Sequence, residues 1–229
     1  MHHRFRVPTP VLMVGTAVAL VGVLTALTLA QPARSSAPDR CTQFALDSRA
    51  LARTTTGTGR RVAVIGDSYA AGLALTDPAT AWTRRLPGQV QVFAFSGSGF
   101  ARASSSCHDV AYDQRAVAAA ATDPAVVVAE GGLNDVTQSD AEIRAGFRRL
   151  LATVGDRPLL VVGPVPAPAR LRGAERVDRT LRLVARRTGT PYLSMIGLRL
   201  TYLDDQLHLT VAGHRAFGDA VAKRLRALR

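Results

Sequence analysis

Five short apolar runs recur between residues 60 and 229, and they alternate with segments in which the apolar residues have amphipathic-helix spacing. The runs are expected strands and cover residues 62–65, 90–95, 126–129, 159–162 and 192–194. The helical segments lie near residues 68–75, 109–121, 140–154, 173–188 and 211–228. Continuous apolar strands that alternate with helices are typical of a parallel sheet covered on both faces. The pattern therefore predicts an α/β fold, a five-stranded parallel sheet in a three-layer α/β/α domain over residues 60–229.

The N-terminus has a different pattern. Residues 11–30 hold no charged side chain and follow Arg4 and Arg6. This length is enough for a transmembrane helix, while a cleavable signal peptide has a shorter apolar region and a small-residue cleavage site, which Thr28-Leu29-Ala30 would supply. We expect a signal anchor or signal peptide in residues 1–30, and a linker and N-terminal extension in residues 31–59. Either form of the N-terminus predicts a protein outside the cytoplasm, membrane-anchored through residues 11–30 or secreted.

The extension has three parts. Residues 31–39 are rich in Pro, Ser and Ala, residues 41–53 have helix-like spacing, and residues 54–59 read as a Thr/Gly loop. The two cysteines, Cys41 and Cys107, form a candidate disulfide, because an even pair in an oxidising compartment is typically bonded. Two separate thiols are the alternative.

The net charge is +12, and Lys223 is the single lysine among 29 basic residues. Nucleic-acid-binding proteins cluster their basic residues and add aromatic platforms. Here the arginines are scattered and only 5% of residues are aromatic, so we predict no nucleic-acid partner. A weak attraction to anionic lipids or polymers stays open.

Polar residues follow the expected strands where each strand ends. Ser68 follows the first, Gly97 and Gly99 the second, and Asn134 the third, while Asp205 and His208 lie in the loop before the last helix. The ligand site of an open parallel sheet lies at the carboxyl ends of its strands. We therefore expect these loops to meet at one edge.

These residue types suit nucleophilic catalysis. A serine needs a base to take its proton, and Asp205, three residues before His208, would orient that base. The Ser68 N–H at a helix start, the Gly99 N–H and the Asn134 amide would bind the oxyanion.

Each assignment has a structural alternative. Ser68 could be an ordinary helix N-cap, Gly99 a turn glycine with Gly97 as rival donor, and Asn134 part of an Asn-Asp turn. His214 is a rival base and Asp204 a rival orienter. We predict no metal and no cofactor, since the remaining His and carboxylate residues have no ligand spacing.

Together the four loops resemble the SGNH hydrolases, also called the GDSL family of esterases and lipases. Their four blocks are similar to Gly66-Asp67-Ser68-Tyr69, with Tyr69 where leucine is usual, to Ser96-Gly97-Ser98-Gly99, to Gly132-Leu133-Asn134-Asp135 and to Asp205-Gln206-Leu207-His208. The asparagine that often precedes the second block is missing. The resemblance covers residues 60–229. It implies a flavodoxin-like sheet, a triad of Ser68, His208 and Asp205, and oxyanion donors from Ser68, Gly99 and Asn134.

We accordingly expect a serine ester hydrolase, an esterase, lipase or carbohydrate deacylase, that acts on a small-molecule, lipid or glycan ester at the cell envelope. Two alternatives stay open. One is an O-acyltransferase that moves the acyl group to or from an envelope glycan or lipid, and the other is a non-catalytic binding module that has kept the site residues.

Overall fold

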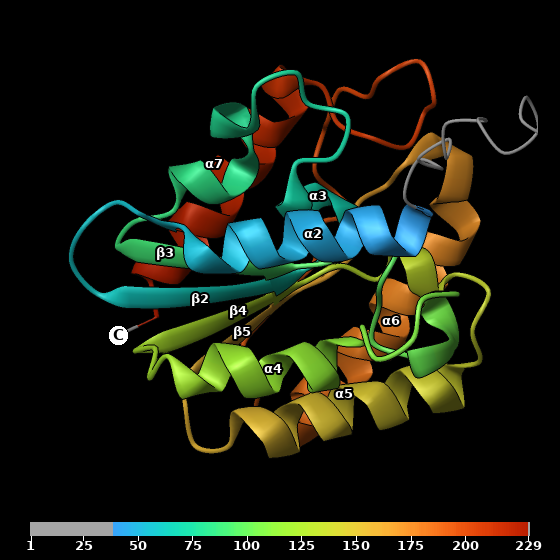
Figure 1. Cartoon of the computed structure of the whole chain (residues 1–229). Helices are drawn as coiled ribbons and strands as arrows, with labels where there is room; N and C mark the ends of the chain where they lie inside the picture. Colours follow the sequence, from blue (N-terminus) through green and yellow to red (C-terminus); the bar gives the residue numbers. More distant parts are fainter. Residues whose placement is uncertain (1–38, 229) are drawn as a thin grey trace, which may run out of the picture. The chain divides into compact units, whose positions relative to one another are not determined.

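The protein forms one mixed sheet between two helical layers (Figure 1), in a computed structural model that describes residues 39–228. The strands are β1 (Thr55–Thr56), β2 (Arg61–Gly66), β3 (Gln89–Ala94), β4 (Val126–Glu130), β5 (Leu159–Val162) and β6 (Tyr192–Leu193). The α-helices are α2 (Arg40–Arg53), α3 (Ser68–Ala71), α4 (Tyr112–Ala121), α5 (Asp140–Val154), α6 (Leu171–Thr188) and α7 (Val211–Arg226). The 3₁₀ turns are η1 (Pro78–Thr80), η2 (Trp82–Arg85), η3 (Arg102–Ser104), η4 (Leu133–Asp135) and η5 (Pro168–Arg170).

The strand order is β1-β3-β2-β4-β5-β6, and β2 to β6 are parallel. Val62 of β2 is in register with Val90 of β3 on one side and with Val126 of β4 on the other. The chain thus builds outward from β2 in both directions, which places the topological switch point at the carboxyl end of β2. Ser68 lies two residues after Gly66, the last residue of β2.

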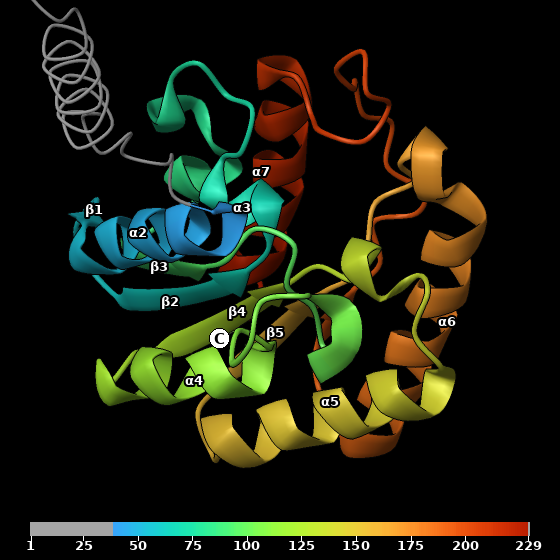
Figure 2. The same cartoon turned by 45° about the vertical axis from the view of Figure 1, so that its right-hand side comes forward.

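Figure 2 shows helices on both faces of the sheet. Successive residues of each strand face opposite layers, so the sheet carries two hydrophobic cores. Val64 belongs to the core that includes Phe217 of α7. Ile65 belongs to the core that includes Phe147 of α5. Burial on both faces is the reason that the strands read as continuous apolar runs in the sequence, and the α/β/α architecture agrees with the prediction.

The structure differs from the predicted sheet at one edge. Residues 54–59 were expected to be a loop, but Thr55–Thr56 pairs antiparallel with β3, which makes six strands instead of five. Two β-branched threonines suit an edge strand, yet they give no apolar run that would reveal it. The helix expected over residues 68–75 also ends early, at Ala71, because Gly72 adopts a left-handed conformation with φ 72°.

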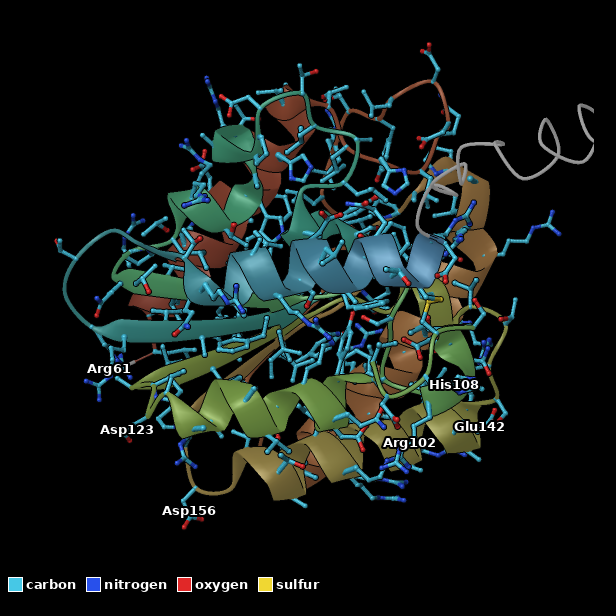
Figure 3. All side chains as sticks on the ribbon, viewed as in Figure 1. Arg61, Arg102, His108, Asp123, Glu142 and Asp156 are labelled. Carbon is cyan, nitrogen blue, oxygen red and sulfur yellow. A yellow bond between two sulfur atoms is a disulfide. The ribbon has the colours of Figure 1, made fainter. Side chains whose placement is uncertain are left out.

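Cys41 and Cys107 are joined by a disulfide with a Cα–Cα distance of 5.6 Å, and the bond lies at the start of α2 (Figure 3). It ties α2 to the long loop between β3 and α4. The expected anchor or signal segment, residues 11–30, lies outside the described residues. Among the helices of residues 39–228, none combines the length and apolar character that a bilayer crossing needs.

Candidate active site

Ser68 lies at the turn from β2 into α3, where the sheet meets the start of a helix. The Asp67 side chain caps this helix by accepting a hydrogen bond from the Tyr69 N–H at 2.9 Å. Ser68 is partly exposed between two buried neighbours, Asp67 and Tyr69. Asp67 therefore performs the capping role that was the alternative for Ser68, and the serine hydroxyl stays at the surface.

Asp205 and His208 form the second part of the site. The Asp205 Oδ2 atom lies 2.6 Å from His208 Nδ1, and Oδ1 accepts the backbone N–H groups of Leu207 and His208 at 2.9 and 2.8 Å. Desolvation alone would raise the pKa of Asp205, but these hydrogen bonds outweigh it and lower the pKa to about 2. Asp205 is therefore a fixed carboxylate that holds one nitrogen of the imidazole.

Tyr69 connects the serine turn to the histidine loop. Its hydroxyl donates a hydrogen bond to the Leu207 carbonyl, and its ring centroid lies 6.3 Å from that of His208. In the described part of the chain, no hydrogen bond joins the Ser68 hydroxyl to His208. Catalytic hydrogen bonds are often long or poorly aligned without substrate. The two loops nevertheless lie at the same end of the sheet in both views (Figures 1 and 2).

The Gly99 loop is held by the carboxylate of Asp135. Asp135 is fully buried and accepts the Phe100 and Ala101 N–H groups at 3.1 and 2.8 Å and the Ser104 hydroxyl at 2.6 Å. A Cβ atom on Gly99 would lie 2.5 Å from Asp135 Oδ2, so only glycine fits there. Asp135 thus has a structural role that fixes the loop carrying the Gly99 N–H.

Asn134 lies beside Asp67, on η4 at the end of β4. Its Nδ2 atom donates to the Ser98 carbonyl at 2.9 Å and to Asp67 Oδ2 at 3.3 Å. Its Oδ1 atom accepts from Arg170 Nη1 at 3.0 Å. The amide nitrogen therefore faces the serine turn and the Gly99 loop together.

Buried charges lie under these loops. Burial raises the pKa of Asp67 to about 6, although the Tyr69 N–H and the Arg115 charge oppose it. Burial also raises the pKa of Glu130 well above its usual range, and neighbouring Asp67 raises it further. The pKa of Arg115 falls to about 10 through burial. The serine turn thus rests on a carboxylate whose charge changes in the mildly acidic range.

The alternative candidates for the base, its orienting carboxylate and the oxyanion glycine have other surroundings. His214 is 1% exposed within α7, its Nδ1 accepts from the Trp82 N–H at 3.4 Å, and burial followed by the His208 charge lowers its pKa to about 4. Asp204 is exposed, while Asp205 holds the imidazole. Gly97 has φ 84° with no atom within 4 Å of an added Cβ, so it is the turn glycine of its loop. His108 is exposed on the surface (Figure 3).

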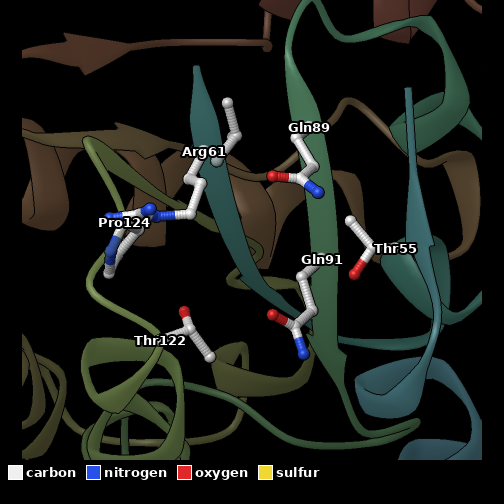
Figure 4. Close-up of a pocket in the computed structure, with 7 residues that line it drawn as sticks. Thr55, Arg61, Gln89, Gln91, Thr122 and Pro124 are labelled. Atoms are coloured by element: carbon white, nitrogen blue, oxygen red, sulfur yellow. The ribbon is translucent and has the colours of Figure 1, made fainter. Parts of the chain in front are cut away.

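One pocket lies at the opposite end of the sheet. It has a volume of about 140 Å³ and includes Arg61 and Gln89, the first residues of β2 and β3 (Figure 4). Ligand sites of open parallel sheets lie at the carboxyl ends, and none of the site residues lines this pocket. Residues 39–228 contain no group of three or more His, Cys, Asp or Glu side chains that could hold a metal ion.

Comparison with protein families identifies the fold and its chemistry. The model of the GDSL-like lipase/acylhydrolase family matches residues 64–216, a stretch that holds Ser68, Gly99, Asn134, Asp205 and His208. The chain belongs to this family. The GDSL-like protein is therefore a serine ester hydrolase. No curated protein sequence matches it.

Solved structures of similar fold cover most of this GDSL-like chain. Est24, a carbohydrate acetylesterase from Sinorhizobium meliloti, is 18% identical with a TM-score of 0.62, over 75% of this chain and 100% of its own. The aryl esterase of M. smegmatis is 19% identical with a TM-score of 0.60, over 75% and 100%. A lipase/acylhydrolase from Enterococcus faecalis is 16% identical with a TM-score of 0.61, over 74% and 96%. At this identity the likeness establishes the fold.

Arg170, which contacts the Asn134 side chain, belongs to none of the four sequence blocks. Its segment begins in the Pro-rich run Pro164-Val165-Pro166-Ala167-Pro168, directly after β5. A loop that follows a parallel strand lies at the ligand edge, and this position was the available signal.

Proposed function

We propose that the protein hydrolyses carboxylic esters through an acyl-enzyme on Ser68, with His208 as the base and Asp205 as its orienting carboxylate. The observation that carries this proposal is the 2.6 Å contact between Asp205 Oδ2 and His208 Nδ1. With Nδ1 held by the carboxylate, Nε2 is left to accept the serine proton. The tie from Tyr69 to Leu207 supports a fixed distance between the base and the serine turn.

In the first half of the reaction, Ser68 Oγ attacks the ester carbonyl carbon while His208 Nε2 takes the hydroxyl proton. The oxyanion accepts hydrogen bonds from the Ser68 and Gly99 N–H groups and from Asn134 Nδ2, where it replaces the long 3.3 Å hydrogen bond to Asp67 Oδ2. His208 then gives its proton to the departing alcohol oxygen as the carbon–oxygen bond breaks. In the second half, His208 deprotonates a water molecule, which attacks the acyl-enzyme and releases the carboxylic acid and Ser68.

The proposed substrates are esters of small acyl groups, with sugar acetates and aryl acetates as the first to test. The support is the fold shared with proteins named carbohydrate acetylesterase and aryl esterase. After β4 and β5 the chain also adds only the single turns η4 and η5 at the site before the next helix begins. A panel of acyl chain lengths on aryl and sugar alcohols would show this preference as the highest kcat/KM for acetyl esters.

We also propose that the enzyme works outside the cytoplasm, held at the membrane by residues 11–30 or released after cleavage there. The uncharged segment and the Cys41–Cys107 disulfide support this location, because disulfides persist in oxidising compartments. Fractionation of cells, followed by N-terminal sequencing of the enzyme, tests it. Recovery of the full chain in the cytosol would contradict the proposal.

The nucleophile is tested by Ser68→Ala. We expect kcat for an aryl acetate to fall by roughly 10⁴–10⁶-fold, since the triad acts as a unit. Thermal unfolding should show an intact fold, because the hydroxyl is partly exposed and makes no hydrogen bond that a described residue requires. Ser106→Ala, at an exposed serine in the loop before Cys107, is the matched control and should keep full turnover. Retained turnover in purified Ser68→Ala enzyme would overturn the assignment.

A further inference from the structure

Arg170 lies where two site loops meet. It is the last residue of η5, which follows β5 at the same sheet edge as Ser68. The preceding residue, Ala169, donates its N–H to the Gln206 carbonyl at 3.1 Å, so the η5 loop adjoins the loop of Asp205 and His208. Arg170 therefore sits between the triad loop and Asn134.

Arg170 is partly buried, and its contacts are to uncharged oxygens. Its Nη1 atom donates to the Leu133 carbonyl at 2.8 Å and to Asn134 Oδ1 at 3.0 Å. It forms no ion pair with a carboxylate of the described chain, whereas Arg176, six residues later, pairs with Asp140. The Arg170 guanidinium is thus shared between two neighbouring oxygens of η4, one from the backbone of Leu133 and one from the side chain of Asn134.

The Asn134 amide has complementary partners on its two ends. A donor faces its oxygen, while two acceptors, the Ser98 carbonyl and Asp67 Oδ2, face its nitrogen. A flipped amide would place NH₂ against the Arg170 guanidinium and the oxygen against a carboxylate. Since no other described side chain donates to Asn134 Oδ1, Arg170 holds the oxygen end of the amide, and it acts together with the two acceptors at the nitrogen end to fix the orientation of the amide.

The charge also affects the strength of the amide as a donor. A cation bound to the oxygen of an amide polarises it, and linked hydrogen bonds strengthen one another where the dielectric is low. A stronger Nδ2–H donor matters most when negative charge develops, which happens in the transition state and not in the bound ester.

We propose that Arg170 is a positioning residue for the oxyanion site, which acts through Asn134 by orienting and polarising its amide. The inference rests on the proposed function, because it assigns Asn134 to the oxyanion. It requires that Arg170 affect kcat and not KM, and that its effect disappear when Asn134 is absent.

A double-mutant cycle tests this on the full enzyme with an aryl acetate. Arg170→Met should lower kcat roughly 10-fold and leave KM within about twofold, while Asn134→Ala should lower kcat about 10²–10³-fold. The double variant should be no slower than Asn134→Ala alone, because Arg170 then has no amide to act on. Arg172→Met removes the same charge from an exposed neighbour on α6 and should keep the wild-type kcat.

The inference is overturned if Arg170→Met keeps kcat within twofold, or if its loss multiplies in full with that of Asn134→Ala. If Arg170→Met does not fold, Arg170→Gln enters the same cycle, because it keeps an amide donor without the charge. Ser68→Ala in the same assay separates the two proposals. An inactive Ser68→Ala with an additive cycle removes the role of Arg170 alone, whereas an active Ser68→Ala removes the proposed function.

Discussion

At the scale of single residues, the site depends on ionisable groups in places that usually exclude them. Asp67 is 1% exposed, and its charge is met by the Tyr69 N–H at 2.9 Å and by the Asn134 amide at 3.3 Å. The Arg115 guanidinium donates hydrogen bonds to three acceptors, the Val110 and Phe93 carbonyls and the Ser98 hydroxyl. Buried charges persist only where such hydrogen bonds replace water. Asp67 and Arg115 therefore support the site loops without a proposed role in the reaction itself.

His214 makes the fold sensitive to acid. Its pKa falls from 6.5 to about 4, first through burial, so the folded state binds fewer protons than the unfolded state between these values. The free energy of unfolding should therefore fall as the pH falls from about 6.5 to about 4. The loss from His214 is on the order of 3 kcal/mol. His214→Gln keeps an acceptor for the Trp82 N–H and should remove this part of the pH dependence.

Urea unfolding between pH 7 and pH 4 measures this effect. Asp67 has the opposite effect on the free energy of unfolding over part of this range. Its pKa is raised to about 6, so below this pH the folded state binds a proton more readily than the unfolded state, and acid stabilises the fold through this group. Asp67 is present in both proteins, so the difference between wild type and His214→Gln isolates His214. His108→Gln, at an exposed histidine, is the control and should follow wild type. Parallel curves for wild type and His214→Gln would contradict the assignment.

At the scale of elements, η4 performs two tasks with adjacent residues. Asn134 directs its amide to the serine turn, and Asp135 holds the Gly99 loop through the Phe100 and Ala101 N–H groups. A single 3₁₀ turn thus sets the distance between two proposed oxyanion donors. This arrangement gives a physical reason for the Asn134-Asp135 pair, which the sequence presents as an ordinary turn.

Gly99→Ala tests this coupling. The new methyl group would lie 2.5 Å from Asp135 Oδ2, so the carboxylate and the loop must move apart, and we expect kcat to fall on the order of 10²-fold. Gly97→Ala is the matched change in open space, where the strain of φ 84° should cost about 1 kcal/mol of stability. Steady-state kinetics and thermal unfolding of both variants separate the two effects. A larger loss of kcat in Gly97→Ala would transfer the donor role to Gly97.

At the scale of the whole molecule, the sequence predicts the parts that depend on a long regular pattern. Strands β2 to β5 are buried on both faces, so they form apolar runs that can be recognised in the sequence. Ser68 and Asn134 follow the carboxyl ends of two of these strands, which made them candidates for the site. The sequence pattern does not predict features that depend on a contact between distant parts of the chain. Thr55–Thr56 became a strand only by pairing with β3, and the tie from Arg170 to Asn134 joins residues 36 positions apart.

The disulfide affects the molecule as a whole, because it closes a loop with a sequence separation of 66 around β1, β2 and β3. Helix α2 has no fully buried residue, although Leu51 and Ala52 pack partly buried against the two cores. It contacts the sheet through the Phe44–Phe95 ring pair at 6.0 Å and the hydrogen bond from Gln91 Nε2 to the Ala52 carbonyl. The bridge adds a covalent tie at the start of α2, and it stabilises the fold by restricting the unfolded chain.

Removal of the bridge by Cys41→Ser with Cys107→Ser should lower the free energy of unfolding by about 4 kcal/mol, the entropy expected for a loop of this length. Denaturant unfolding measures the loss, and wild type under a reducing agent should lose the same amount. Limited proteolysis should then cut within α2 earlier than within α5, whose buried residues Phe147 and Leu150 hold it independently. An unchanged free energy of unfolding would mean that the packing of α2 on β3 suffices, so the bridge would have no part in stability.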